Sequence, residues 1–134
     1  MYDYKWSNWR TRQFSIYQQL GTGGFIAITG DTIVKDKKPS DGATWADSDN
    51  DGDLDCYVVN WYNTKNLFYN NTGVGAFTQT QNAIETSGGY CETASWGDYD
   101  NDGLLDLYVT EVVAPDTNKI YFFIMKEAMY LQRY

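Results

Sequence analysis

The chain has 134 residues, of which 43% are hydrophobic and 17% aromatic, enough to build one modest domain core. Its net charge of −8, which no basic stripe offsets, argues against nucleic acid or an anionic membrane as a partner. No apolar stretch is long enough to cross a bilayer, and residues 1–14 lack the apolar core of a signal peptide, so any export signal is expected outside this sequence.

Residues 13–30 predict two strands joined by a glycine turn. The spacing Y-x-x-x-G-x-G-x-F begins at Tyr17 and returns at Tyr69. Glycine tolerates the positive φ angles that tight turns need, so each occurrence is expected to be a hairpin. Residues 1–38 are therefore interpreted as the outer strands of a partial repeat unit.

Residues 47–55, here called loop 1, read D-S-D-N-D-G-D-L-D. Carboxylates at alternate positions converge on one point if the chain wraps around it, and the glycine at the sixth position allows the sharp turn. Hard oxygen ligands of this kind suit Ca²⁺. The predicted ligands are the side chains of Asp47, Asp49, Asp51 and Asp55 and the main-chain carbonyl of Asp53.

The same pattern occurs at residues 98–106, here called loop 2, as D-Y-D-N-D-G-L-L-D. Its predicted ligands are the side chains of Asp98, Asp100, Asp102 and Asp106 and the carbonyl of Leu104. Two calcium ions are therefore expected. The alternative is a solvated acidic turn without metal, which is less favoured because so many neighbouring carboxylates repel one another.

An EF-hand is not predicted, because the position of its bidentate Glu holds Val58 in one copy and Val109 in the other. Each loop instead runs into a segment rich in β-branched and aromatic residues, which indicates a strand. In the first complete unit, strands are predicted around Trp45 and over 54–60, 66–71 and 76–82.

The apolar pattern of residues 54–60 predicts a strand that is buried on both faces. Leu54, Cys56 and Val58 alternate with Tyr57 and Val59. Such a sheet needs a neighbour on each side, which blades stacked around an axis provide. Residues 39–89 are therefore interpreted as a complete four-stranded blade.

Residues 90–134 are interpreted as a second calcium-loop blade, truncated or divergent at its C-terminal end. Ala43, Trp45, Tyr57 and Val58 recur as Ala94, Trp96, Tyr108 and Val109. The glycines expected after Tyr121 are missing. For residues 122–134 a short amphipathic helix, a divergent cap and an out-of-frame end all remain open.

These motifs together resemble the FG-GAP/VCBS repeats of integrin-α-like β-propellers, in particular bacterial repeats of the cartilage-acidic-protein type. The resemblance covers roughly residues 15–121 and rests on both Asp-rich loops and on N-L-F-Y-N-N-T-G-V-G-A-F. It implies an all-β, partial β-propeller of about two four-stranded antiparallel blades. It also implies that each loop joins the first two strands of a blade and binds one Ca²⁺, in an extracellular or cell-surface protein.

Two classes of function fit this resemblance. The first is adhesion or protein interaction. The alternative is a carbohydrate-binding propeller, possibly attached to a polysaccharide-degrading enzyme, in which Trp61 and Tyr62 would face a sugar. No enzyme activity is expected, because the chain offers no histidine as a base and no G-x-S-x-G motif. Besides calcium, the expected partners are a protein or glycan ligand and further blades, either of a longer chain or by self-association.

Cys56 and Cys91 are the two cysteines of the chain. Cys56 stands at the repeat position of Leu107, which favours a small buried hydrophobe. A Cys56–Cys91 disulfide is the less favoured alternative.

Overall fold

The computed structural model describes residues 15–73, 75–80, 90–113, 117–126 and 130–133. Those residues contain one 3-10 helix, η2 (Thr32–Val34), and the strands β1 (Tyr17–Gln19), β2 (Phe25–Ala27), β3 (Ser40–Ala46), β4 (Asp55–Asn60), β5 (Leu67–Asn71), β6 (Phe77–Thr80), β7 (Tyr90–Gly97), β8 (Asp106–Val113), β9 (Thr117–Lys126) and β10 (Tyr130–Arg133). In this described part of the chain, no helix is long and apolar enough to span a membrane.

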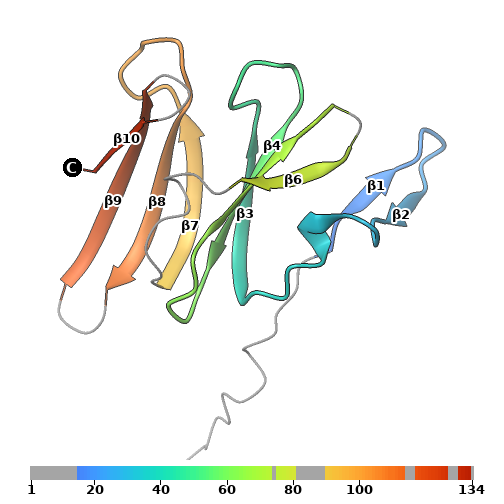
Figure 1. The fold of residues 1–134 in the computed structure, drawn as a ribbon, viewed down its shortest axis with the longest axis horizontal. Coiled ribbons are helices and arrows are strands. Elements are labelled where there is room, and N and C mark those ends of the chain that lie inside the picture. The colour runs from blue at the N-terminus through green and yellow to red at the C-terminus, as the bar shows by residue number, and fades with distance from the viewer. Residues whose placement is uncertain (1–14, 74, 81–89, 114–116, 127–129, 134) are drawn as a thin grey trace, which may run out of the picture.

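The strands form one hairpin and two four-stranded antiparallel sheets, as Figure 1 shows. The hairpin is β1–β2, and the sheets have the strand orders β3-β4-β5-β6 and β7-β8-β9-β10. Each four-stranded sheet is a meander, because neighbours in the sequence are neighbours in the sheet. The predicted all-β class and the predicted four-stranded antiparallel blades are confirmed.

The sheet β3–β6 is covered on both faces, as the pattern of β4 predicts. On one face Tyr57 and Val59 pack with Phe68 of β5 against residues of the second sheet, including Leu107 and Val109. β7 contacts both β3 and β4, so the first strands of the two sheets lie next to each other. This face is the interface between the two blades.

The other face of β4 packs against the N-terminal part of the chain. Cys56 and Val58 share a buried cluster with Ile33 and Val34 of η2. Asp31 caps η2 by accepting from Ile33 N (3.1 Å), and its second oxygen accepts from Phe77 N (3.1 Å) in β6. This one side chain therefore ties η2 to the edge of the sheet. Leu54, expected on this face, is instead 55% exposed, since it precedes the first residue of β4.

The two repeat copies have the same strand register. Trp45 pairs with Cys56, and Trp96 pairs with Leu107. Both pairings shift at a bulge near their start, between Ser40 and Gly42 in one copy and between Cys91 and Thr93 in the other. The duplication seen in the sequence is therefore a duplication of backbone geometry.

The last hairpin differs from its predicted alignment. Tyr121 was placed at the repeat position of Tyr69, but it pairs with Val109, where Leu67 pairs with Val58. Phe123, opposite Leu107, holds the position of Tyr69. The reason is that the β8–β9 hairpin is longer than the β4–β5 hairpin, so the residues of β9 that pair with β8 lie further along the sequence. The helix considered for residues 122–134 is wrong, because the described residues of this segment belong to β9 and β10 and pair with each other in the sheet.

The cysteines are free and buried, and they belong to different sheets, Cys56 to β4 and Cys91 to β7. Cys56 belongs to the cluster with η2, whereas Cys91 belongs to the cluster between the blades. A disulfide would need the β-carbons of the two cysteines to lie a few ångströms apart and to point toward each other. The disulfide alternative is therefore wrong.

Cys56 predicts a loss of stability at alkaline pH. Burial, with a smaller contribution from the charge of Asp55, raises the pKa of its thiol from 9.0 to about 12. Between these two pKa values the folded thiol keeps its proton, whereas the unfolded thiol loses it. The contribution of the thiol to the free energy of unfolding is therefore complete below pH ~9 and is lost between pH ~9 and ~12, by at most about 1.4 kcal/mol per pH unit. Urea unfolding at pH 8 and pH 10 measures the free energy of unfolding at each pH. Between these two values it should fall less for Cys56→Val than for the wild type. An equal fall in both proteins would contradict a role of the Cys56 thiol.

Candidate calcium site in the Asp-rich loops

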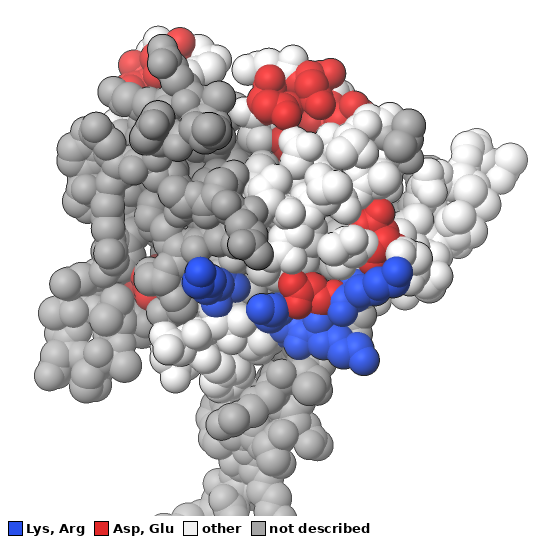
Figure 2. Space-filling view, in the orientation of Figure 1, with Lys and Arg blue, Asp and Glu red and all other residues white. Residues whose placement is uncertain are grey.

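The two Asp-rich loops lie at the same end of their sheets. Loop 1 joins β3 to β4 and loop 2 joins β7 to β8, both at the upper end in Figure 1. Acidic side chains gather at this end, whereas basic and acidic side chains lie side by side lower on the same face of the molecule, as Figure 2 shows. The end that carries the loops is therefore the side of the molecule that attracts cations.

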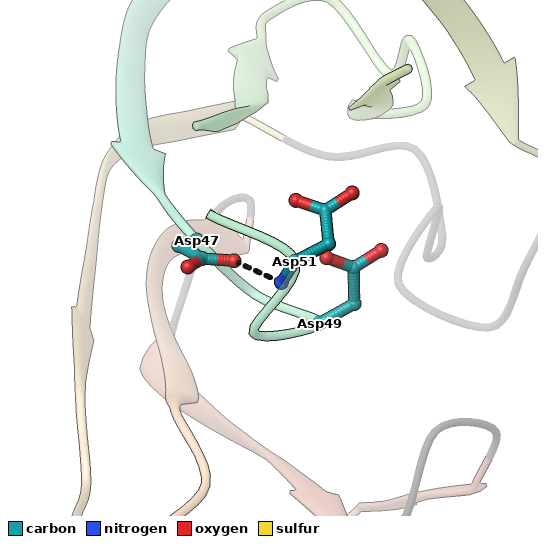
Figure 3. A group of neighbouring side chains, drawn as sticks. All are labelled: Asp47, Asp49 and Asp51. Carbon is teal, nitrogen blue, oxygen red and sulfur yellow. Dashed lines mark hydrogen bonds between the residues drawn. The ribbon is translucent and has the colours of Figure 1, made fainter. Parts of the chain in front are cut away.

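Loop 1 folds around the carboxylate of Asp47, which is drawn in Figure 3. Its Oδ1 accepts from Asp51 N and its Oδ2 from Gly52 N, each at 3.0 Å. Asn50 (φ 59°) and Gly52 (φ 94°) adopt left-handed backbone conformations that make this tight wrap possible. The loop thus has the curled backbone that the D-x-D-N-D-G pattern predicts.

Three carboxylates of loop 1 converge. Asp47, Asp49 and Asp51 each offer one oxygen, and these oxygens lie within 4.8 Å of one another. Asp51 is also held by the loop, since its Oδ1 accepts from Asp53 N at 2.9 Å. Oxygens at this spacing need only small movements to reach one ion, whose Ca–O distances are about 2.3–2.6 Å.

Asp55, the last predicted side-chain ligand of loop 1, lies outside that group. It is buried and accepts hydrogen bonds from Ser48 N (3.2 Å) and from the Ser48 hydroxyl. Its Oδ1 accepts from Asn70 Nδ2 (3.2 Å) and Asn71 N (2.9 Å) at the end of β5. Asp55 therefore links the loop to the neighbouring strand.

Asn70 and Asn71 lie at the end of the strand predicted over residues 66–71, and the sequence alone predicts no role for them at the loop. Asn70 Nδ2 also donates to Asp49 Oδ2 (3.0 Å), and Asn71 Nδ2 donates to the carbonyl of Leu54 (3.2 Å). The signal for this contact is the pairing of β4 with β5, which brings the end of β5 beside the start of β4. The glycine-turn motif and the Asp-rich loop, separate in the sequence, meet here.

Loop 2 repeats the wrap of loop 1. Asp98 Oδ1 accepts from Asp102 N (3.1 Å), and its Oδ2 accepts from Gly103 N (3.0 Å). Asp102 Oδ1 accepts from Leu104 N (2.9 Å). Asn101 and Gly103 have φ angles of 58° and 88°, close to those of their counterparts in loop 1.

The converging carboxylates of loop 2 are a different set. Asp98, Asp100 and Asp106 offer oxygens within 4.8 Å of one another, whereas Asp102 lies outside the group. Asp106 is only 5% exposed, and its Oδ2 accepts from Tyr99 N at 2.7 Å. Its Oδ1 is buried and accepts no hydrogen bond from the described residues. A buried acceptor left without a partner costs roughly 1–3 kcal/mol, and more when it is charged, so a cation at this position would relieve a real penalty.

The residue types of both groups select a hard cation. All the converging atoms are carboxylate oxygens, with no histidine or thiolate among them. Such a set suits Ca²⁺, which accepts flexible arrangements of six to eight oxygens, better than Zn²⁺, which prefers nitrogen and sulfur. Main-chain carbonyls and water would complete each coordination shell.

The aromatic residues proposed to face a sugar lie beyond the opposite end of β4. Trp61, Tyr62 and Tyr90 form a mutual edge-to-face cluster, with ring centroids 5.8–6.1 Å apart. All three are half-buried. Their rings are thus engaged with one another across the two blades, which is the packing role expected of clustered aromatics.

The family comparison agrees with these loops and strands. The model of the FG-GAP-like repeat matches residues 47–109. This segment is therefore similar to an FG-GAP-like repeat. The match runs from the first residue of loop 1, through β4 to β7 and loop 2, into β8, and just under half of the chain lies within it. The chain matches no curated protein and no solved structure at a significant level.

The FG-GAP-like repeat is a propeller-type unit, so the two four-stranded sheets are blades of a partial β-propeller. The resemblance inferred from the sequence is confirmed. Proteins that contain such repeats are typically extracellular.

Proposed function

We propose that this chain is a calcium-binding propeller segment of an extracellular or cell-surface protein that serves adhesion or protein interaction. One Ca²⁺ would bind in each Asp-rich loop and hold the end of its blade in shape. The observation that carries the proposal is Asp106, whose buried oxygen lacks a donor among the described residues and which converges with Asp98 and Asp100. The protein would act by presenting this surface, without catalysis.

Adhesion is favoured over sugar binding because the carboxylates that could hold an ion are exposed, whereas the aromatic rings that could face a sugar are packed. Ion-dependent recognition needs coordination positions that a partner can approach, and Asp49, Asp51 and Asp100 are exposed at one end of the blades. Trp61 and Tyr62, in contrast, pack against Tyr90. The partner would then be a protein that contributes a carboxylate to the ion.

Isothermal titration calorimetry tests the metal step. We expect two Ca²⁺ per chain and much weaker binding of Mg²⁺, which demands a smaller octahedral site. Absence of binding at millimolar Ca²⁺ would refute the proposal.

The two sites should be separable by substitution. Asp49→Ala removes a converging carboxylate from loop 1 and Asp100→Ala removes its counterpart from loop 2. Each variant is expected to bind one Ca²⁺ and to leave the other site nearly unchanged, since the loops belong to different blades. Loss of both ions from either single variant, with the circular dichroism of the fold retained, would contradict two independent sites.

A further inference from the structure

The two loops share a backbone but differ in the last carboxylate of the pattern. In loop 1, Asp55 Oδ1 already accepts from Asn70 Nδ2 and Asn71 N. In loop 2, Asp106 Oδ1 is equally buried but accepts nothing from the described residues. Asp106 joins the converging carboxylates of its loop, whereas Asp55 does not.

The difference follows from the strand that lies beside each loop. Tyr69 pairs with Cys56, so the next residue, Asn70, reaches the start of β4. In the second blade Phe123 pairs with Leu107, and the next residue is Ile124. An isoleucine side chain has no hydrogen-bond donor, so this position of β9 offers no counterpart of the Asn70 amide.

The Asn70 amide lies between two carboxylates that a cation in loop 1 would bind, those of Asp49 and Asp55. Carboxylates only accept hydrogen bonds, so the NH₂ end of Asn70 is the end that faces them. This one nitrogen lies 3.0 Å from Asp49 Oδ2 and 3.2 Å from Asp55 Oδ1. An ion that bound both oxygens would have to displace it, at the expense of hydrogen bonds to charged groups.

We infer that the two loops bind Ca²⁺ unequally: loop 2 is the tighter site, and Asn70 acts as an internal competitor that weakens loop 1. This inference rests on the proposed calcium binding. Loop 2 gains a partner for a buried oxygen when it binds the ion, and loop 1 loses hydrogen bonds. Because a hydrogen bond to a charged group corresponds to a factor of about ten or more in affinity, we expect Kd values at least about tenfold apart.

An NMR titration of the full chain with Ca²⁺ resolves the two loops without any substitution. The amides of Gly52 and Gly103 donate to Asp47 and Asp98, so each reports on its own loop. We expect the Gly103 signal to reach half of its change at about a tenfold lower free Ca²⁺ than the Gly52 signal. Equal midpoints, or an earlier change at Gly52, would overturn the inference and leave the proposed function intact. If neither signal moves and calorimetry detects no heat, the proposed function itself fails.

Asn70→Leu tests the role of the amide, because leucine keeps the approximate shape and removes the donor. Loop 1 should bind about tenfold more tightly in this variant, so that the two midpoints approach each other. Thr78→Val is the matched control: Thr78 pairs with Asn70 across β5 and β6, and its hydroxyl donates to the main-chain oxygen of Asn70 and not to a carboxylate, so the gap between the midpoints should persist.

A weaker loop 1 in Asn70→Leu, with the dispersion of the other amide signals retained, would show that Asn70 supports the ion and would overturn its role as competitor. If the variant does not fold, the order of the two glycine signals in the wild type still decides whether the loops are unequal.

Discussion

Chelation of calcium is expected to lower the melting temperature of the chain sharply. An ion that binds only the folded state adds RT ln(1 + [Ca²⁺]/Kd), about 2.7 kcal/mol for each site at a hundredfold excess over Kd. Two sites together amount to roughly 5 kcal/mol, comparable to the whole stability of a small domain. Each kcal/mol corresponds to about 2–8 °C in a domain of this size range, so EGTA should shift the transition by more than 10 °C.

Thermal unfolding followed by circular dichroism in Ca²⁺ and in EGTA measures this shift. Mg²⁺ at the same ionic strength controls for general screening of the acidic end, and should restore little of the stability. The double variant Asp49→Ala, Asp100→Ala should melt at the same temperature in both buffers. An identical melting temperature of the wild type with and without Ca²⁺ would refute a stabilising role for the metal.

The sequence predicted the local features of this fold well, because each of them depends on residues that are close together in the sequence. Alternation along residues 54–60 predicted a strand with two buried faces, and the structure places Tyr57 and Cys56 in separate clusters on those faces. The glycine at the sixth position of the Asp-rich loops predicted a sharp turn, and Gly52 and Gly103 adopt the left-handed conformation there. In both cases the responsible residues are neighbours in the chain.

The features that the sequence did not predict depend on strand register. Asn70 reaches Asp49 and Asp55 only because β5 pairs with β4 at one particular offset. Tyr121 was misaligned for the same reason, since the longer β8–β9 hairpin changes the offset without changing the composition of the strand. The D-x-D-N-D-G pattern therefore locates the loop. The contacts of the last carboxylate depend instead on the register of the neighbouring hairpin.

The equivalence of Asp55 and Asp106 in the repeat hides two different environments. Both begin a strand after the same turn, and both are buried. One has a full set of donors, whereas the other leaves an oxygen for which the described residues supply none. Duplication has thus preserved the loop while its surroundings have diverged, which is how two copies of one motif can come to differ in affinity.

Tyr57→Ala is expected to cost about 3–5 kcal/mol of stability, enough to unfold much of the chain at 37 °C. Tyr57 is 0% exposed and lies between the two blades with Leu107 and Val109. Its hydroxyl accepts from Asn66 Nδ2 (3.1 Å), which also donates to Cys91 Sγ (3.2 Å) in the second blade. The substitution would therefore leave a cavity and a buried amide short of one partner.

Urea unfolding of two further variants separates these contributions. Tyr57→Phe keeps the ring and removes only the hydroxyl, so it should cost about 1–3 kcal/mol. Tyr17→Ala is the same truncation at a position that is 62% exposed, and it should change the free energy of unfolding by no more than about 0.5 kcal/mol. If Tyr57→Ala were as mild as Tyr17→Ala, the face of β4 that carries Tyr57 would not be packed in solution. The interface between the two blades would then not form as described.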